Sequence, residues 1–318
     1  MKKLNAFLVL AMTVFFFYST AMGATYIVNH DDEDAQFQTI QKAIDNARSN
    51  DTIKVVASNT SYRESIDIDK NLTLIGAGPQ YTEVESDGNV FSFSIDHLNV
   101  TIIGFKICSN TQSGIYIDKE NTILKISNCI LVNCYNGIYL YRKTACRIII
   151  QNNTILNCSR NGIYYDSTSN NNYSYGYLKV EGNIIAFNAS YGISADAATE
   201  IVKYNNVFGN KENAFSGISV DADDGNIINQ DPGFLDMNYV LSGNDPKSPC
   251  IDKGIIGDEF ADPDQTRNDI GAFGGPNCAP FWPYEIPGGG PIITNLDVTP
   301  TSVPKGHKII IRAKGRVQ

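Results

Sequence analysis

Short runs of alternating apolar and polar residues recur through the middle of the chain. Each run is followed by a polar turn, a glycine and a second alternating run. Runs of three to five residues with a period of two are typical of β-strands, and turns at fixed offsets exclude helical repeats. One unit cannot bury its own apolar side, but a stack of units can. The pattern predicts an all-β fold, a right-handed parallel β-helix. The repeated glycines, spaced by 23, 25, 30 and 25 residues, are Gly114, Gly137, Gly162, Gly192 and Gly217.

Alignment of the units places like residues in columns, as expected where stacked parallel strands lie about 4.8 Å apart. Two apolar columns should point inward, and an Asn/Cys column at a turn should form a ladder of buried small side chains. We interpret the cysteines of this ladder, and Cys129, as packing residues rather than disulfide partners. The column after the glycines is Ile115, Ile138, Ile163, Ile193 and Ile218. The other two columns are Ile107, Leu131, Ile155, Ile185 and Val207, and Asn110, Cys134, Cys158, Asn188 and Asn210.

The ends of the repeat predict a capped solenoid with a short C-terminal tail. Apolar residues at helical spacing within residues 36–48 predict an amphipathic helix over the first coil, where an open edge would recruit other strands. The β-helix domain is expected to span residues 24–276. Residues 277–291 are rich in Pro and Gly and predict a linker. Residues 292–318 predict two strands, similar to the start of an immunoglobulin-like β-sandwich that is apparently truncated.

The N-terminus predicts export. Lys2 and Lys3 precede an apolar run over residues 6–18, and small residues end at Gly23, so residues 1–23 are expected to be a signal peptide. The alternative, a membrane anchor, is disfavoured because a span needs about 20 apolar residues. The mature chain should be secreted or at the cell surface, with the periplasm as an alternative. No later segment is apolar enough to span a membrane, and a net charge of −9 argues against nucleic acid as partner.

A family resemblance supports the same fold. The N-terminal stretch, the Gly-Ile units and the closing SPCIDKG…DPDQTRNDIGAFGG resemble exported bacterial parallel β-helix proteins of the pectate-lyase-like superfamily, over about residues 25–276. The resemblance implies the fold but no single reaction, because this architecture hosts lyases, hydrolases, esterases, epimerases and non-enzymatic adhesins.

The catalytic motifs of that superfamily are absent from the sequence. The start is similar to that of pectin methylesterases, but their Asp-Phe-Ile-Phe-Gly motif is missing, as are the Asn-Thr-Asp and Gly-His-Gly patterns of polygalacturonases. Ile95-Asp96-His97 resembles a pectate lyase motif without its partner motif, so we expect His97 in an ordinary turn. His30 and His307 have no neighbouring Ser/Asp arrangement in the sequence that would suggest a triad.

Two outward columns carry the candidate chemistry. Aromatic rings pack on sugar rings and carboxylates bond hydroxyls, so the pair suggests a sugar-binding surface; the alternative is ordinary strand surface. Asp196 and Asp221 would lie one coil apart, about 5 Å, which suits a retaining glycosidase pair or Ca²⁺. The first column is Tyr116, Tyr139, Tyr164, Ser194 and Ser219, two residues after each glycine. The second is Asp118, Tyr141, Asp166, Asp196 and Asp221, four residues after each glycine.

The closing segment holds a further acidic group around Arg267. It predicts either a calcium loop or, by preference, a capping structure in which Arg267 pairs with a carboxylate. No Cys/His cluster assigns a metal site, and Ca²⁺ is the one cofactor that the acidic residues suggest.

Two functional hypotheses remain open from the sequence. One is a secreted β-helix that binds polysaccharide or a cell-surface glycan without catalysis, through Tyr116, Tyr139, Tyr164 and Asp118. The alternative is a polysaccharide lyase or glycoside hydrolase acting on an acidic glycan, with Asp166, Asp196 and Asp221 as candidates. Lys179 and Lys203, the lysines traced in the outward columns, lie only at strand starts, so binding is preferred.

Overall fold

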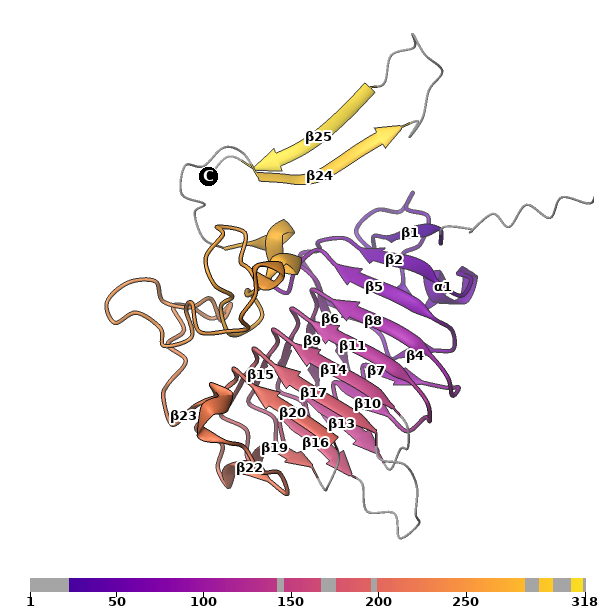
Figure 1. Cartoon of the computed structure of the whole chain (residues 1–318). Coiled ribbons are helices and arrows are strands. Elements are labelled where there is room, and N and C mark those ends of the chain that lie inside the picture. The colour runs from indigo at the N-terminus through magenta and orange to yellow at the C-terminus, as the bar shows by residue number, and fades with distance from the viewer. Residues whose placement is uncertain are drawn as a thin grey trace, which may run out of the picture.

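The computed structural model describes residues 23–141, 146–166, 176–195, 199–283, 292–299 and 310–316. Within these residues the chain winds into a solenoid of three parallel sheets, which run side by side along one axis (Figure 1). The predicted right-handed parallel β-helix is confirmed. No helix in the described part of the chain has the length and apolar character of a membrane span. The predicted signal peptide lies almost wholly outside the described residues.

From β2 to β22 each coil contributes one strand to each sheet, in the order A, B, C. Sheet A consists of β1 (Thr25–Val28), β2 (Asp51–Val55), β5 (Leu72–Gly76), β8 (Asn99–Ile103), β11 (Ile123–Ser127), β14 (Arg147–Gln151), β17 (Tyr177–Glu181) and β20 (Thr199–Lys203). Sheet B consists of β3 (Tyr62–Arg63), β6 (Glu83–Ser86), β9 (Lys106–Ser109), β12 (Ile130–Val132), β15 (Thr154–Leu156), β18 (Ile184–Ala186), β21 (Asn206–Phe208) and β23 (Ile227–Ile228). Sheet C consists of β4 (Ile66–Ile68), β7 (Phe91–Phe93), β10 (Ile115–Ile117), β13 (Ile138–Tyr141), β16 (Ile163–Asp166), β19 (Tyr191–Ala195) and β22 (Asn213–Ser216).

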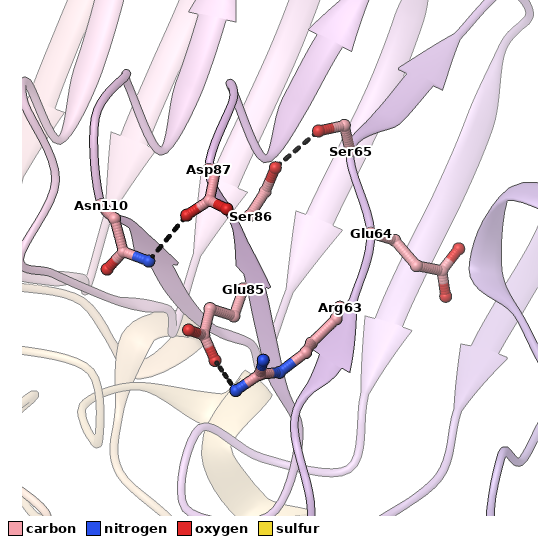
Figure 2. Close-up of a pocket in the computed structure, with 7 residues that line it drawn as sticks. All are labelled: Arg63, Glu64, Ser65, Glu85, Ser86, Asp87 and Asn110. Carbon is pink, nitrogen blue, oxygen red and sulfur yellow. Dashed lines mark hydrogen bonds and ion pairs between the residues drawn. The ribbon is translucent and has the colours of Figure 1, made fainter.

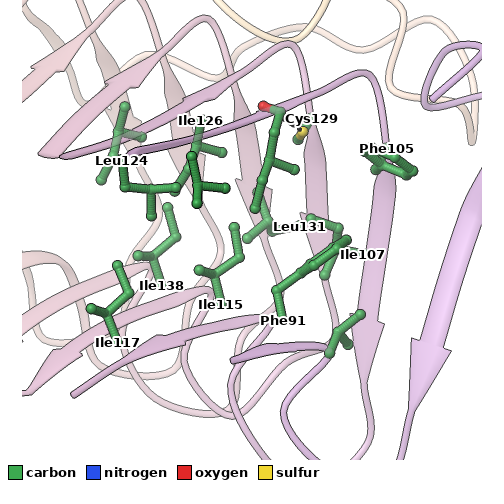
Figure 3. Packing of buried hydrophobic residues seen from close by; sticks show 14 of the residues in the cluster. Phe91, Phe105, Ile107, Ile115, Ile117, Leu124, Ile126, Cys129, Leu131 and Ile138 are labelled. Atoms are coloured by element: carbon green, nitrogen blue, oxygen red, sulfur yellow. Dashed lines mark hydrogen bonds between the residues drawn. The ribbon is translucent and has the colours of Figure 1, made fainter. Parts of the chain in front are cut away.

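The core is the interior of the solenoid, filled by one apolar side chain above another. Ile115 pairs with Ile138, Ile138 with Ile163, and Ile163 with Ile193, and all four are buried. Figure 3 shows Ile115 and Ile138 side by side, facing the residues of sheets A and B across the interior. The inward columns predicted from the sequence are therefore correct for these coils.

The last coil departs from the predicted alignment. Phe215, not Ile218, pairs with Ile193, and Ser216, not Ser219, pairs with Ser194. The length of the turn before the strand explains the shift. Asn188 precedes Gly192 by four residues and Asn210 precedes Ala214 by four residues, so Ala214 takes the place of the glycine in the last coil. Turn length, which sets the register, therefore outweighs the similarity of the Gly-Ile-Ser motif. The expectation that Ile218 lies stacked inside is wrong; it is only partly buried at the edge of the core.

Buried asparagines and cysteines line the turns. The predicted turn ladder is present from Cys134 onward, and the Asn188 Nδ2 donates to Asn210 Oδ1 at 2.8 Å. Asn110 is not part of it, since its side chain is exposed and bonds Asp87. A second ladder occupies the turn between sheets A and B, with side-chain amide bonds of 3.0, 3.0 and 3.1 Å through Asn153, Asn183, Asn205 and Asn226. All seven cysteines are buried and lie outside disulfide bonds, as the packing interpretation predicted for the three at the repeat positions.

A short helix covers the first coil. Helix α1 (Ile40–Asn46) buries Ile40, Ala43 and Ile44 against β1, β2 and β4. It is shorter than the predicted 36–48, and Phe37 lies instead in a bridge to Val28. The carboxylate of Glu64 accepts hydrogen bonds from the first-turn N–H groups of Ile40 and Gln41, at 2.8 and 3.0 Å. A helix N-terminus favours an anion, so this contact fixes the cap to the solenoid.

The closing segment runs back along the outside of sheet B. This returning segment, residues 231–282, buries Phe273, Phe281 and Trp282 against the outer side chains of sheet B. Asn128 Nδ2 anchors it by donating to the carbonyls of Ala272 and Gly274, at 3.0 and 2.7 Å. Two 3₁₀ turns lie within it, Asp258–Phe260 and Pro276–Phe281. The segment therefore covers one side of the solenoid, a correction to the capping structure expected at its end.

Arg267 also differs from its predicted role. Its guanidinium donates to the backbone carbonyls of Gly254 and Lys253 and lies over the Tyr204 ring, with no carboxylate partner among the described residues. Two carboxylates of the segment, Asp262 and Asp269, are instead buried and accept backbone N–H groups. Beyond the segment, β24 (Ile292–Thr299) and β25 (Ile310–Arg316) form the expected pair of strands, which is antiparallel.

Candidate functional site

Three tyrosines lie in register on the outer face of sheet C. Tyr116 of β10 pairs with Tyr139 of β13, which pairs with Tyr164 of β16. Their inward neighbours fill the core, so the pleat turns all three side chains outward, where they are half-buried. We call these residues, with Tyr141, the tyrosine face. The structure thus brings together the aromatic column that the sequence predicted.

The rings stack along the solenoid axis. The ring centroids of Tyr139 and Tyr164 are 5.1 Å apart with an interplanar angle of 21°, and those of Tyr116 and Tyr139 are 5.4 Å apart at 59°. Tyr141 meets the Tyr139 ring edge-on at 5.8 Å. Because this spacing is close to the distance between neighbouring strands, the rings of Tyr139 and Tyr164 stack face to face along the solenoid.

Small residues flank the stack in the same outward column. Ser194 of β19 follows Tyr164, and Ser216 of β22 follows Ser194. At the other end the residue next to Tyr116 is Ser92 of β7, since Phe91 pairs with Ile115. Ser194 and Ser216, which we call the serine shelf, therefore put small side chains at the two positions where the outward column continues beyond Tyr164.

The hydroxyls of Tyr139 and Tyr116 stay protonated over the physiological range. Burial raises the pKa of Tyr139 to about 12, with Asp166 and the neighbouring tyrosines adding to the effect. Burial, followed by Asp118, also raises the pKa of Tyr116. Each hydroxyl can consequently donate as well as accept a hydrogen bond.

The acidic column is less exposed than the sequence suggested. Asp118 is partly exposed and forms an ion pair with Lys119, with Nζ and Oδ1 3.2 Å apart. Asp166, in register with Tyr141, is buried, with only 7% of its surface exposed, where the alternation predicted an outward side chain. The two carboxylates thus border the tyrosine face without forming an open acidic row.

Of the predicted pair of Asp196 and Asp221, the structure describes only Asp221. Asp196 lies outside the described residues. Asp221 is exposed and caps a 3₁₀ turn, Ala222–Asp224, five residues beyond the serine that continues the outward column. The shift of the last coil places Asp221 beyond the end of β22, and not two residues after the column serine, the position from which the glycosidase and Ca²⁺ hypotheses for this pair were inferred. In the described ranges no three His, Cys, Asp or Glu side chains are grouped to hold a metal ion.

A hollow of about 290 Å³ lies at the corner between sheets B and C in the first coils (Figure 2). Its polar side chains bond one another: Arg63 with Glu85 at 3.7 Å, and Asn110 with Asp87 at 3.0 Å. In Figure 2 the Glu64 carboxylate points away from this group, in keeping with its role at the start of α1. The polar side chains of its walls are therefore already paired with one another.

Of the three histidines considered from the sequence, His307 lies outside the described residues. His97 lies in an exposed turn with φ of 63°, as predicted. His30, expected to have no Ser/Asp neighbours, has its Nε2 2.6 Å from Ser58 Oγ and 3.1 Å from Asp31 Oδ1. Ser58 Oγ and Asp31 Oδ1 both contact Nε2 of His30, whereas in a catalytic triad the serine and the acid contact different nitrogens of the imidazole ring. The group therefore fixes the loop at Ser58 and does not have triad geometry.

Comparison with known proteins supports the fold. A family model described as a right-handed β-helix region matches residues 86–177, the coils that carry the tyrosine face. No curated protein matches the chain. The three-sheet solenoid and this match fit the pectate-lyase-like superfamily, as the sequence resemblance implied.

Proposed function

We propose that this chain is an exported β-helix that binds a polysaccharide on the tyrosine face without catalysis. The observation that carries the proposal is a stack of three registered tyrosines that ends beside a shelf of serines. A sugar ring has an apolar face that packs on an aromatic ring, and hydroxyls that bond polar groups around it.

The geometry favours a sugar that continues the stack. A pyranose above Ser194 would lie beside the Tyr164 ring, at the register position where a further tyrosine of the column would stand. Its hydroxyls would then meet the side chains of Ser194 and Ser216, both partly exposed. Longer chains would extend along the ring edges and hydroxyls of Tyr139 and Tyr116.

Charge favours a neutral glycan over an acidic one. Asp118 borders the face, and the whole chain carries a net charge of −9, so a polyuronate would be repelled at low ionic strength. The acidic glycan of the alternative hypothesis would need a basic or cation-bearing surface. On the tyrosine face Lys119 is already paired with Asp118.

Affinity gel electrophoresis tests this proposal. Gels containing glucomannan, galactan, polygalacturonate or alginate should retard the protein in at least one neutral polysaccharide and less in the acidic ones. Tyr164→Ala should weaken retardation about tenfold, as expected if contact worth about 1.4 kcal/mol is lost. Ser194→Tyr should also abolish it, because the added ring would occupy the proposed sugar position.

Tyr177→Ala is the matched control. Tyr177 is a half-buried tyrosine on a strand of the same solenoid, but on the outer face of sheet A, where Arg147 lies over its ring. Retention of binding in Tyr164→Ala, or equal loss in the control, would remove the tyrosine face as the site. The same mixtures are assayed for new reducing ends and unsaturated products, whose appearance would replace passive binding with an enzyme.

A further inference from the structure

A second hollow, of about 220 Å³, lies over the first coils of sheet B, away from the tyrosine column. Its walls come from three distant parts of the chain: the loop at residues 58–61, the strands β6 and β9, and the turn at residues 236–239 of the returning segment. Sites built from several segments and lined by convergent polar groups are the usual form of small-molecule sites.

The floor of this hollow is an ion pair between adjacent strands. Glu83 of β6 is in register with Lys106 of β9, and Lys106 Nζ is 3.2 Å from Glu83 Oε2. The other oxygen of Glu83 accepts from Cys108 Sγ at 3.3 Å. Both charged side chains keep about a third of their surface exposed. The carboxylate of Glu83 thus accepts hydrogen bonds from two residues. The ammonium of Lys106 has three N–H donors but bonds only one acceptor within the described residues.

The walls are fixed by their own hydrogen bonds. His30 Nε2 bonds Ser58 Oγ at 2.6 Å and Thr60 Oγ1 at 2.9 Å, which holds the loop that forms one wall. On the opposite side, Asp236 Oδ1 accepts from the N–H of Asn238 and so shapes the turn. A preformed site of this kind loses little conformational entropy on binding.

The chemistry of the lining points to a neutral polyhydroxylated ligand. The charges of Glu83 and Lys106 cancel, and the remaining polar groups are hydroxyls and amides such as Thr60 and Asn238. Tyr81 and Met237, both exposed apolar side chains, lie at the rim, where an apolar ring face could pack. The volume is below the roughly 300–1,000 Å³ of sites for larger ligands, so it suits one ring.

A purely stabilising role accounts poorly for this pair. The outer face of sheet B further along is apolar and covered by the returning segment, which buries Ile130, Val132 and Leu156. Replacing a half-buried ion pair by apolar residues in such a setting is often neutral or stabilising. We propose that the hollow bounded by Glu83, Lys106, Asn238 and Tyr239 binds a single neutral sugar unit, independently of the tyrosine face.

Saturation-transfer NMR with defined probes tests the inference. The methyl glycosides of glucose, galactose and mannose are compared with glucuronate on the full chain. At least one neutral glycoside should bind, and Lys106→Gln should weaken it about tenfold. Asn238→Trp, an exposed position on the turn, should block the hollow in case Lys106→Gln disturbs folding.

Two controls separate this site from others. Lys179→Gln removes a comparable ion pair, with Glu181 on sheet A, and should leave binding unchanged. Tyr139→Ala should also leave it unchanged, so a failure of the polysaccharide proposal would not affect this result. The inference is overturned if no neutral glycoside binds, if glucuronate binds more tightly, or if Lys106→Gln and Asn238→Trp both retain binding.

Discussion

Sheets B and C of the same solenoid present opposite kinds of outer face. In sheet B every residue of β12, β15 and β18 is buried, because the returning segment covers the strands from outside. In sheet C the strands β10 and β13 alternate between buried and half-exposed residues, and the tyrosine face remains open. One coil repeat therefore builds a covered face and an open face, and only the open one is free to meet a large ligand.

The residue pattern of the strands accounts for the difference between the two sheets. Strands buried on both faces are continuous apolar runs, whereas strands with one solvated face alternate. The triplets Ile-Leu-Val and Ile-Ile-Ala of sheet B are of the first kind, and Ile-Tyr-Leu-Tyr of sheet C is of the second. The continuous runs could have indicated a covering segment before the structure was known.

The largest expected effect comes from placing a charge on each face of one coil. Leu156→Lys puts an ammonium beneath the returning segment, at a side chain that is 1% exposed. It should lower the free energy of unfolding by about 4 kcal/mol or more, the range of unpaired buried charges. Tyr164→Lys, in the next strand of the same coil but on the open face, should cost about 1 kcal/mol.

Chemical denaturation of both variants measures the contrast. The two substitutions introduce the same residue less than ten positions apart, so the difference reports the cover and not the added lysine. Equal losses in both variants would mean that the returning segment does not seal sheet B in solution.

A smaller effect should come from pH, because the cover of sheet B contains two buried carboxyls. Burial raises the pKa of Asp262 to about 8, with Asp269 adding to it, and burial raises the pKa of Asp269 to about 7. An unfolded aspartate ionises near 3.8. The unfolded chain therefore releases these protons first, and stability should fall as pH rises from about 4 to about 8.

Thermal unfolding between pH 5 and pH 8.5 measures this fall, at about 2–4 °C for each kcal/mol lost. Asp262→Asn should flatten the slope, although it also weakens the bonds from the Asp269 and Gly275 N–H groups. Hydrogen exchange should place the loosening in residues 231–282. A melting temperature that rises over this interval would contradict the assignment.

Much of the fold could be predicted from the sequence, because stacked coils put like residues on like. The columns through Ile115, Ile138 and Ile163, the capping helix and the buried cysteines at the repeat positions all follow from local pattern and composition. The last coil was predicted wrongly because a Gly-Ile-Ser motif outweighed turn length in the alignment. The last coil has Ala214 at the position of the repeated glycine, so the glycine that marks the other coils is missing there.

The candidate sites were less predictable. Outward tyrosines follow from period-two alternation, but neither the burial of Asp166 nor the ion pair of Asp118 follows from it. The pairing of Glu83 with Lys106 had one usable signal, a separation of 23 residues that matches one coil. The third wall of that hollow comes from the returning segment, whose path depends on long-range packing and not on any local pattern.

Hydroxyl-radical footprinting with mass spectrometry tests the central claim, that the open face of sheet C holds the glycan. The protein is oxidised alone and with the polysaccharide that retards it most in the gels. Oxidation of Tyr116, Tyr139 and Tyr164 should fall when the glycan is present, while Tyr177 on sheet A stays unchanged. Protection of Tyr177 alone, or unchanged oxidation of the tyrosine face in the bound sample, would contradict the account.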